Sequence, residues 1–232
     1  MNEIAEIEPG IFRLKTDRMD LRLEAKKPPL LVGGKGHITV CGRESYYHSL
    51  TDIEATGMVR GEDGWVAVEG RAWMDHQWAD ESYRKDKWTW FSVKLDDGAD
   101  IMVVEYDDGR RKEYIASVMD ARGRASHFGE AILTPSGEPW QSAQTNAKYP
   151  MAWKISIPHA GIELRTESLM RDQEMVFGTI NYWEGPIAIR GMVGGKRVRG
   201  SGFMELVGYP ADYNPFVLAG RELNRRILDF FK

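Results

Sequence analysis

The stretch GRAWMDHQWADESYRKDKWTWFSVKLDDG (residues 70–98) carries four of the chain's eight tryptophans and sets an aspartate next to a histidine. Side chains alternate between the two faces of a β-strand, so an extended AWMDHQW segment sorts into two sets. One face receives Trp73, Asp75 and Gln77, and the other receives Met74, His76 and Trp78. We predict that one of these faces lines a cavity, where an acid or imidazole can move protons. The alternative is a core strand whose Asp75 and His76 bond to backbone.

The pattern of that stretch repeats along most of the chain, as short strands separated by turns rich in glycine and aspartate. Strands are predicted at residues 11–14, 37–40, 65–73, 88–95, 101–106, 114–119, 153–157, 162–168, 178–184, 187–193 and 200–207. Asp-Gly turns, such as the one that ends the quoted stretch, accept the positive φ angles of hairpins. The chain is therefore predicted to be all-β and antiparallel, a barrel or sandwich. One amphipathic helix is predicted at residues 217–232, where apolar residues recur at spacings of three and four.

Composition excludes several classes of function. The chain has 232 residues and a net charge of −4, and its basic runs are short and not interleaved with aromatic residues, so no nucleic-acid partner is expected. The acidic N-terminus contains no apolar segment of signal-peptide length, and no apolar run approaches the roughly 20 residues that span a bilayer. A cytoplasmic protein without a membrane span is predicted.

The few potential metal ligands are scattered. The single cysteine, Cys41, excludes an intramolecular disulfide and a thiolate zinc cage, and the five histidines lack close ligand spacing. Nucleotide-binding fingerprints and the familiar hydrolase motifs are also absent from the sequence. No metal and no cofactor are therefore expected.

Three further acids lie among large apolar residues. Glu105 is in phase with apolar positions 101 and 103, and Glu184 and Glu205 belong to the aromatic segments YWEG and GFMELVGY. Burial penalises a carboxylate that is neither paired nor protonated. A protonated carboxyl group in an apolar cavity is suited to protonate a carbon–carbon double bond. Pairing with an arginine, such as Arg165 or Arg190, is the other interpretation of Glu184 and Glu205.

An ordered set of motifs resembles the carotenoid 1,2-hydratase (hydroxyneurosporene synthase) and AttH-like family. The matching segments are SYYxS (residues 45–49), GxAWMDHQW (70–78), WxWF (88–91), LDDG (95–98), YPxxWxIxIP (149–158), YWEG (182–185) and GxGFMELVGY (200–209). The resemblance covers about residues 28–209. It implies two successive lipocalin-like β domains that enclose an apolar site, in hydratases that need no cofactor and in relatives that guide cycloadditions.

The resemblance also divides the chain and places residues in its site. It implies a shortened N-terminal lipocalin-like domain at residues 1–84, and a C-terminal one at residues 85–232 that ends in the helix. Strands missing from the first domain would come from a second copy of the chain, which makes a homo-oligomer one expected assembly. The His-x-Trp of the family maps to His76 and Trp78, and a family tyrosine and acid map near Glu105, Tyr106 or Asp108.

These observations lead to a functional hypothesis. The chain is predicted to be a cofactor-independent lyase or cyclase that acts on a hydrophobic polyene, isoprenoid or polyketide between its two domains. Asp75 or Glu105 protonates or polarises the substrate, and His76 orients that acid or activates water. The residues expected to hold the substrate are Trp78, Trp88, Trp90, Tyr47, Tyr106 and Trp183. The alternatives are a lipocalin-type carrier without turnover and a structural subunit that completes a partner's barrel.

Overall fold

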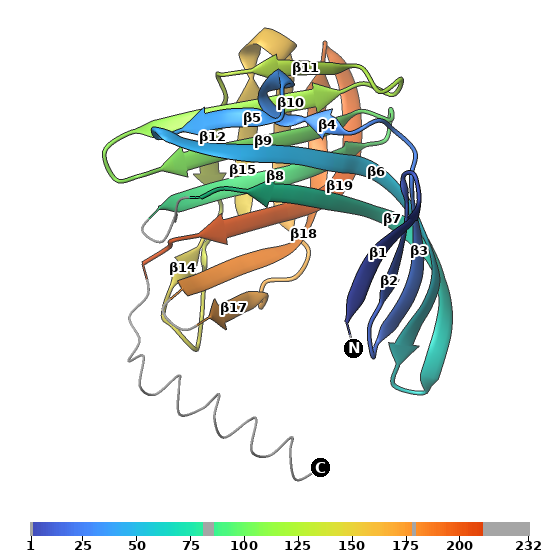
Figure 1. Ribbon diagram of the computed structural model, residues 1–232. Helices are drawn as coiled ribbons and strands as arrows, with labels where there is room; N and C mark the ends of the chain where they lie inside the picture. The colour runs from blue at the N-terminus through green and yellow to red at the C-terminus, as the bar shows by residue number, and fades with distance from the viewer. Residues whose placement is uncertain (1, 81–85, 178–179, 211–232) are drawn as a thin grey trace.

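The computed structural model describes residues 2–80, 86–177 and 180–210, and almost all of its regular structure is antiparallel β-sheet (Figure 1). The helix predicted at residues 217–232 lies outside the described residues. Two short 3-10 turns, η1 (Val32–Gly34) and η2 (Pro158–Ala160), are the helical elements of the described part. In that part, no helix has the length and apolar character needed to cross a membrane.

The strands form two large sheets and a small one. The seven-stranded sheet contains β1 (Glu3–Glu8), β2 (Ile11–Lys15), β3 (Met19–Ala25), β4 (Leu30–Leu31), β5 (His37–Val40), β6 (Arg43–Gly61) and β7 (Gly64–Trp78). The ten-stranded sheet contains β8 (Lys87–Leu95), β9 (Asp100–Asp107), β10 (Lys112–Met119), β11 (Ala125–Phe128), β12 (Ile132–Ser136), β15 (Ala152–Ile157), β16 (Ile162–Ser168), β17 (Glu174–Phe177), β18 (Ile180–Val193) and β19 (Lys196–Val207). The small sheet pairs β13 (Trp140–Gln141) with β14 (Lys148–Tyr149).

The hairpin of β6 and β7 is the central element of the first sheet, because β3, β4 and β5 all pair with β6. β6 pairs with β7 along its length, while its other edge pairs first with β5 and β4 and then with β3. The register shifts between Leu50 and Ile53, which marks a bulge in the hairpin. Beyond this bulge the hairpin continues into a lobe that it shares with β1, β2 and β3, set apart from the rest of the molecule (Figure 1). A strand was predicted within β7, whereas the 19-residue strand β6 was not among the predicted strands.

The second sheet curls around its own core. Its order is β11-β10-β9-β8-β19-β18-β16-β15-β12, yet buried residues from distant strands, such as Val103 of β9 and Ile155 of β15, belong to one apolar cluster. The two strands predicted at residues 178–184 and 187–193 are one strand, β18, despite Pro186. β17 pairs with β18 only as far as Trp183, and the pairing of β16 with β18 begins at Ile187, so the missing N–H of Pro186 falls between the two partner strands.

The two sheets pack through a separate apolar cluster. Leu30, Ile38 and Tyr47 of the first sheet meet Trp90 and Met102 of the second. Next to this cluster lies a charged junction at the bulge of β6. The Nζ atom of Lys94 donates to the backbone oxygen of Thr51 (2.8 Å), to Asp52 (2.8 Å) and to Asp100 (2.9 Å). The sheets are thus joined by both apolar packing and ion pairs. The face of β7 that carries Asp75 is directed to the second sheet.

Candidate active site

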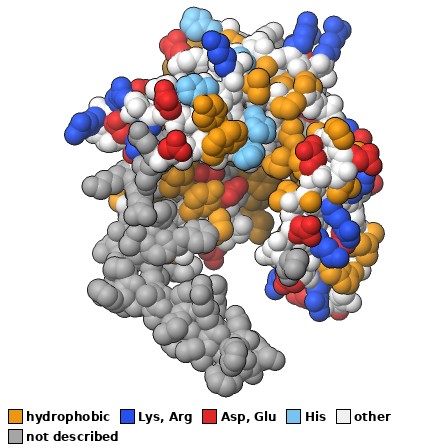
Figure 2. All heavy atoms as spheres, viewed as in Figure 1, with side chains coloured by type: hydrophobic (Ala, Val, Ile, Leu, Met, Phe, Trp, Pro, Cys, Tyr) orange, Lys and Arg blue, Asp and Glu red, His pale blue; other side chains and the backbone are white. Residues whose placement is uncertain are grey.

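A pocket of about 480 Å³ lies where the two sheets face each other. Its walls are Ser45, Tyr47, Asp75, Gln77, Trp78, Ala79, Trp88, Trp90, Tyr106 and Glu205. β6 and β7 provide one wall, and β8, β9 and β19 provide the other. Figure 2 shows the hollow in this face of the molecule, with hydrophobic and acidic side chains inside it. Indole rings and hydrogen-bonding groups therefore share one enclosure.

Asp75 is the best-connected polar group of this pocket. Its Oδ1 accepts from the Ser49 hydroxyl (2.5 Å) and from the Trp73 indole N–H (2.7 Å), and its Oδ2 accepts from the Tyr47 hydroxyl (2.8 Å). Asp75 is exposed by its surface area, and the partial loss of water around its carboxyl group still raises the pKa of Asp75, while these three donors act against the rise. The carboxylate is thus held in a fixed orientation and is still reachable from the pocket.

Tyr47 links Asp75 to the apolar wall. Its ring is 2% exposed, and its hydroxyl oxygen accepts the indole N–H of Trp90 (2.9 Å) while the hydroxyl hydrogen points to Asp75. Burial, followed by the nearby charge of Asp75, raises the pKa of Tyr47 well above its usual range. Tyr47 therefore stays protonated and acts as a permanent donor to Asp75. Trp73 stands edge-on to Trp90 with ring centroids 6.2 Å apart, which fixes both indoles.

Glu205 is a second carboxyl group in the same pocket, and its surroundings favour the protonated form. Burial raises the pKa of Glu205 to about 7, and the charges of Glu184 and Asp75 add to the rise. Hydrogen bonds from Trp88 and Tyr182 oppose it. Glu184 lies directly opposite Glu205 across β18 and β19, and neither acid forms an ion pair with an arginine in the described part of the chain. The arginine pairing considered for these acids is therefore not found there.

Gln77 and Ser45 form a second polar part of the pocket wall. The Gln77 amide donates to the Ser45 hydroxyl (3.0 Å) and approaches the Tyr106 hydroxyl (3.5 Å). Ser45 donates in turn to the backbone oxygen of Trp78 (3.2 Å), which ties the end of β7 to β6. These groups add hydrogen-bonding capacity to the pocket wall beside the two carboxyl groups.

The raised pKa of Glu205 predicts a specific pH dependence of stability. A carboxyl group whose pKa is higher in the folded than in the unfolded chain binds more protons when folded, so its contribution falls as pH rises from about 4.5 to about 7. Glu205→Gln removes this loss. Urea denaturation gives the free energy of unfolding of both proteins. As pH rises from 5 to 8, the difference between variant and wild type should shift in favour of the variant by on the order of 2 kcal/mol. Equal pH profiles for both proteins would contradict the assignment.

Six of the nine residues predicted for the site line the pocket: Asp75, Trp78, Trp88, Trp90, Tyr47 and Tyr106. His76 does not, because it lies on the opposite face of β7, as alternation along the strand requires. Glu105 is directed to the core side of β9, where it is buried and bonded to Lys112 (2.8 Å) and Tyr114 (2.6 Å). Trp183 is fully buried in the core of the second sheet and donates to the backbone oxygen of Arg171 (2.7 Å).

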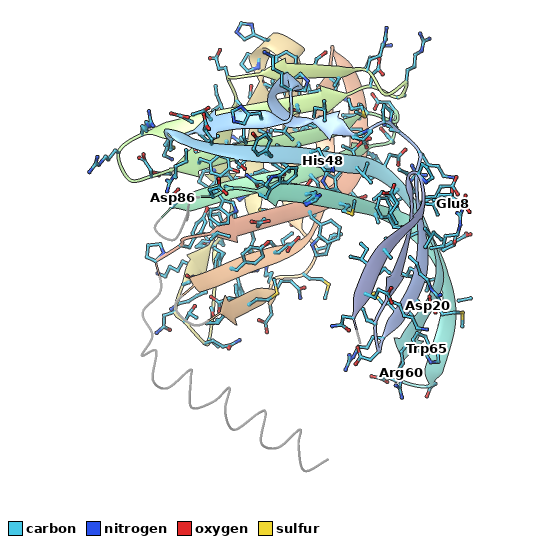
Figure 3. The ribbon with its side chains drawn as sticks, in the orientation of Figure 1. Glu8, Asp20, His48, Arg60, Trp65 and Asp86 are labelled. Atoms are coloured by element: carbon cyan, nitrogen blue, oxygen red, sulfur yellow. The ribbon has the colours of Figure 1, made fainter. Side chains whose placement is uncertain are left out.

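His76 belongs instead to an aromatic cluster on the outer surface of the β6–β7 hairpin. His48 pairs with His76 across the hairpin, with ring centroids 5.2 Å apart, and Figure 3 labels His48 on this surface. Trp78 stacks on Tyr46 at 5.4 Å and lies 4.8 Å from His76, so it borders both this cluster and the pocket. The described residues contain no cluster of histidine, cysteine and carboxylate side chains suited to a metal ion.

The other pocket residues were harder to predict from the sequence. Glu205 stood out as an acid among apolar residues, but it was not selected for the site. It shares the outer face of β19 with Phe203, which is 45% exposed, and this in-phase placement is the signal that could have found it. Ser45 and Gln77 lie within the matching motifs at residues 45–49 and 70–78 and are in phase with Tyr47 and Asp75, but neither was selected for the site.

A curled antiparallel sheet with a second sheet packed against its outer face, and a pocket between them, defines an all-β protein of lipocalin type. A family model described as AttH-like matches residues 3–209, and the chain belongs to this family. This confirms the resemblance found in the sequence motifs.

Two curated relatives carry enzyme names. Kievitone hydratase of Fusarium solani subsp. phaseoli is 27% identical over 142 residues, which is 58% of this chain and 40% of that protein. Dehydratase asqC of Emericella nidulans is 24% identical over 204 residues, 81% of this chain and 57% of that protein. The chain thus spans about half the length of the curated relatives it matches. A crystal structure of a putative AttH from Nitrosomonas europaea superposes with a TM-score of 0.77 at 28% identity, over 89% of this chain and 67% of that one.

Proposed function

We propose that the chain is a cofactor-independent lyase that adds water to, or removes it from, a small hydrophobic substrate in the pocket between the two sheets. The observation that carries this proposal is the pair of carboxyl groups, Asp75 and Glu205, that line one pocket and interact electrostatically. Burial, with the nearby charges of Glu184 and Asp75 adding to it, raises the pKa of Glu205 to about 7, so this carboxyl group keeps its proton in part of the molecules near neutral pH. The names of the hydratase and dehydratase relatives support the same reaction class.

The two carboxyl groups take different roles because their surroundings differ. Glu205, with its pKa near 7, gives its proton to one carbon of a double bond. A water oxygen then bonds to the other carbon, and the Asp75 carboxylate accepts a proton from that water. The proton returns from Asp75 to Glu205 through solvent, so the net change is the addition of one water molecule. Dehydration follows the same steps in reverse.

The aromatic wall provides the binding surface and stabilises charge. Trp88 and Trp90 lie on the face of β8 that looks into the pocket, and the indole N–H groups of both are already bonded, to Glu205 and Tyr47. Trp88 is partly exposed, whereas Trp90 is 7% exposed, so Trp88 offers the larger ring surface to a substrate. An indole face attracts a cation by about 0.5–2 kcal/mol, which favours the positive carbon formed by protonation. Exclusion of water by these rings also strengthens the two carboxyl groups' interactions with bound substrate.

A turnover assay separates this function from a carrier without catalysis. The purified chain would be incubated with kievitone, simple alkenyl phenols and hydroxy ketones, and the products followed by mass spectrometry. We expect at least one compound to gain or lose the mass of one water molecule. A product of unchanged mass would indicate cyclisation instead, for which the rings hold the substrate folded and no proton donor is needed.

The carrier alternative makes the opposite prediction. In that case tryptophan fluorescence would report binding of the same compounds, and every bound compound would be recovered unchanged. Fluorescence is a suited readout because Trp78, Trp88 and Trp90 line the pocket. Binding without any change of mass across the panel would reject the lyase proposal.

A further inference from the structure

A row of four cationic side chains crosses the outer face of the second sheet. Lys154 on β15 lies opposite Arg165 on β16, Arg165 lies opposite Arg190 on β18, and Arg190 lies opposite Arg199 on β19. All four residues are exposed. Like charges that face each other across neighbouring strands destabilise a sheet. Folding alone therefore gives no reason for four of them in register.

No acid neutralises this row within the described part of the chain. None of the four side chains has an ion-pair or hydrogen-bond partner there. The nearest carboxylates belong to Asp96, Glu163 and Glu167, and none of them forms an ion pair with the row. Asp96 accepts the backbone N–H of Arg199 (3.2 Å), Glu163 accepts from the Ser156 hydroxyl, and Glu167 lies two residues from Arg165 on the same face of β16. The guanidinium and ammonium donors of the row are thus left for a ligand.

The surface around the row is concave. A hollow of about 800 Å³ lies along it, bordered by the cations Lys154, Arg165, Arg190, Arg197 and Arg199 and by only two carboxylates, Asp96 and Glu163. A second hollow of about 280 Å³ shares Arg165 and Arg190 with the first, so these two arginines stand between both. The larger hollow is within the roughly 300–1,000 Å³ range of small-molecule sites.

We propose that this cationic row is a binding site for a small molecule that carries several phosphate groups. Neighbouring strands are about 4.8 Å apart, so four of them place cations along about 14 Å, a length suited to an extended polyanion. Planar guanidinium groups pair with phosphate oxygens through two parallel hydrogen bonds, and three of the four residues are arginine. The ligand would lie across the strands, with Arg165 and Arg190 at its centre.

This site is separate from the pocket between the sheets. Arg199 and Glu205 are six residues apart on β19 and share its outer face, which places them about 20 Å apart at the rise of a strand. Binding at the row can therefore be measured without any knowledge of the substrate of the pocket, and its failure would leave the proposed lyase function untouched.

Isothermal titration calorimetry with tripolyphosphate, on the full chain at low ionic strength, tests the proposal. We expect one binding event per chain, weakened at least about tenfold by the double variant Arg165→Gln, Arg190→Gln, because each charge-assisted bond contributes more than the 1.4 kcal/mol that corresponds to tenfold. The matched control is Arg110→Gln, Arg122→Gln, which removes two exposed cations from turns where only their backbone N–H groups are bonded. Its affinity should stay within about twofold of the wild type.

Three results would overturn the proposal. The first is equal weakening in both double variants, which would assign the binding to net charge alone. The second is an absence of binding by the wild type at millimolar tripolyphosphate. The third is equal affinity for citrate, which would remove the assignment to phosphate. Thermal melting of each variant verifies the fold, and substitution of exposed side chains should leave the melting temperature unchanged within a few degrees.

Discussion

Replacement of Asp75 by asparagine is expected to lower kcat about a thousandfold and to leave substrate affinity within a few fold, since general acid–base groups contribute about 10²–10⁴. An amide cannot accept the proton of the attacking water. The amide oxygen can take the place of Oδ1 and accept from Ser49 and Trp73, and the amide NH2 group then faces the Tyr47 hydroxyl oxygen, to which it can donate, so the pocket keeps its shape. Initial rates over a range of substrate concentrations separate kcat from KM, and fluorescence titration reports affinity directly.

The neighbouring residue provides the matched control. His76 is adjacent to Asp75 in the sequence but lies on the outer face of the hairpin, against His48 and Trp78. His76→Gln should therefore change kcat by no more than about twofold, as expected for a surface substitution remote from the reaction. Equal losses in the two variants would mean that the hairpin as a whole, and not the carboxylate, supports turnover.

The second large effect is expected at Glu205. If its protonated form is the donor, kcat/KM of the wild type falls as pH rises through about 7, where that form is lost. Glu205→Gln should lower activity at least about a hundredfold at pH 6, because the amide has no proton to give. It should also remove the fall of kcat/KM above pH 7, the alkaline limb of the pH–rate profile. A pH–rate profile of both proteins provides the measurement.

Glu184→Gln tests whether the loss of activity at alkaline pH is caused by deprotonation of Glu205. The charge of Glu184 helps to raise the pKa of Glu205, so its removal should lower that pKa and shift the alkaline limb to lower pH, with activity retained at pH 5. A limb that stays in place would show that another group sets it. An undiminished rate in the Glu205→Gln protein would favour cyclisation, which requires no donor.

Alternation along a strand predicted a large part of the site. It placed Asp75 and Gln77 on one face of β7 and His76 on the other, and the structure has the same division. It also placed Trp88 and Trp90 together on β8. The all-β class and most strand positions followed from the same period of two.

Alternation could not decide which face of each strand meets the pocket. Glu105 is in phase with apolar residues, and that face of β9 is directed into the solid core of the second sheet. Trp183 lies likewise on the inner face of β18. Glu205 joins Asp75 across 130 positions of sequence because β19 pairs with β8, and this long-range pairing leaves no local pattern. The face and the partner of a strand depend on the curl of the sheet.

The hairpin of β6 and β7 connects the lobe to the pocket. Its two strands extend from the lobe, past the bulge between Leu50 and Ile53, to the wall that carries Asp75. Lys94 of the second sheet binds Thr51 and Asp52 at the bulge and so joins the hairpin to that sheet. The lobe and the pocket wall that carries Asp75 are therefore parts of one hydrogen-bonded hairpin, which is attached to the second sheet at its bulge.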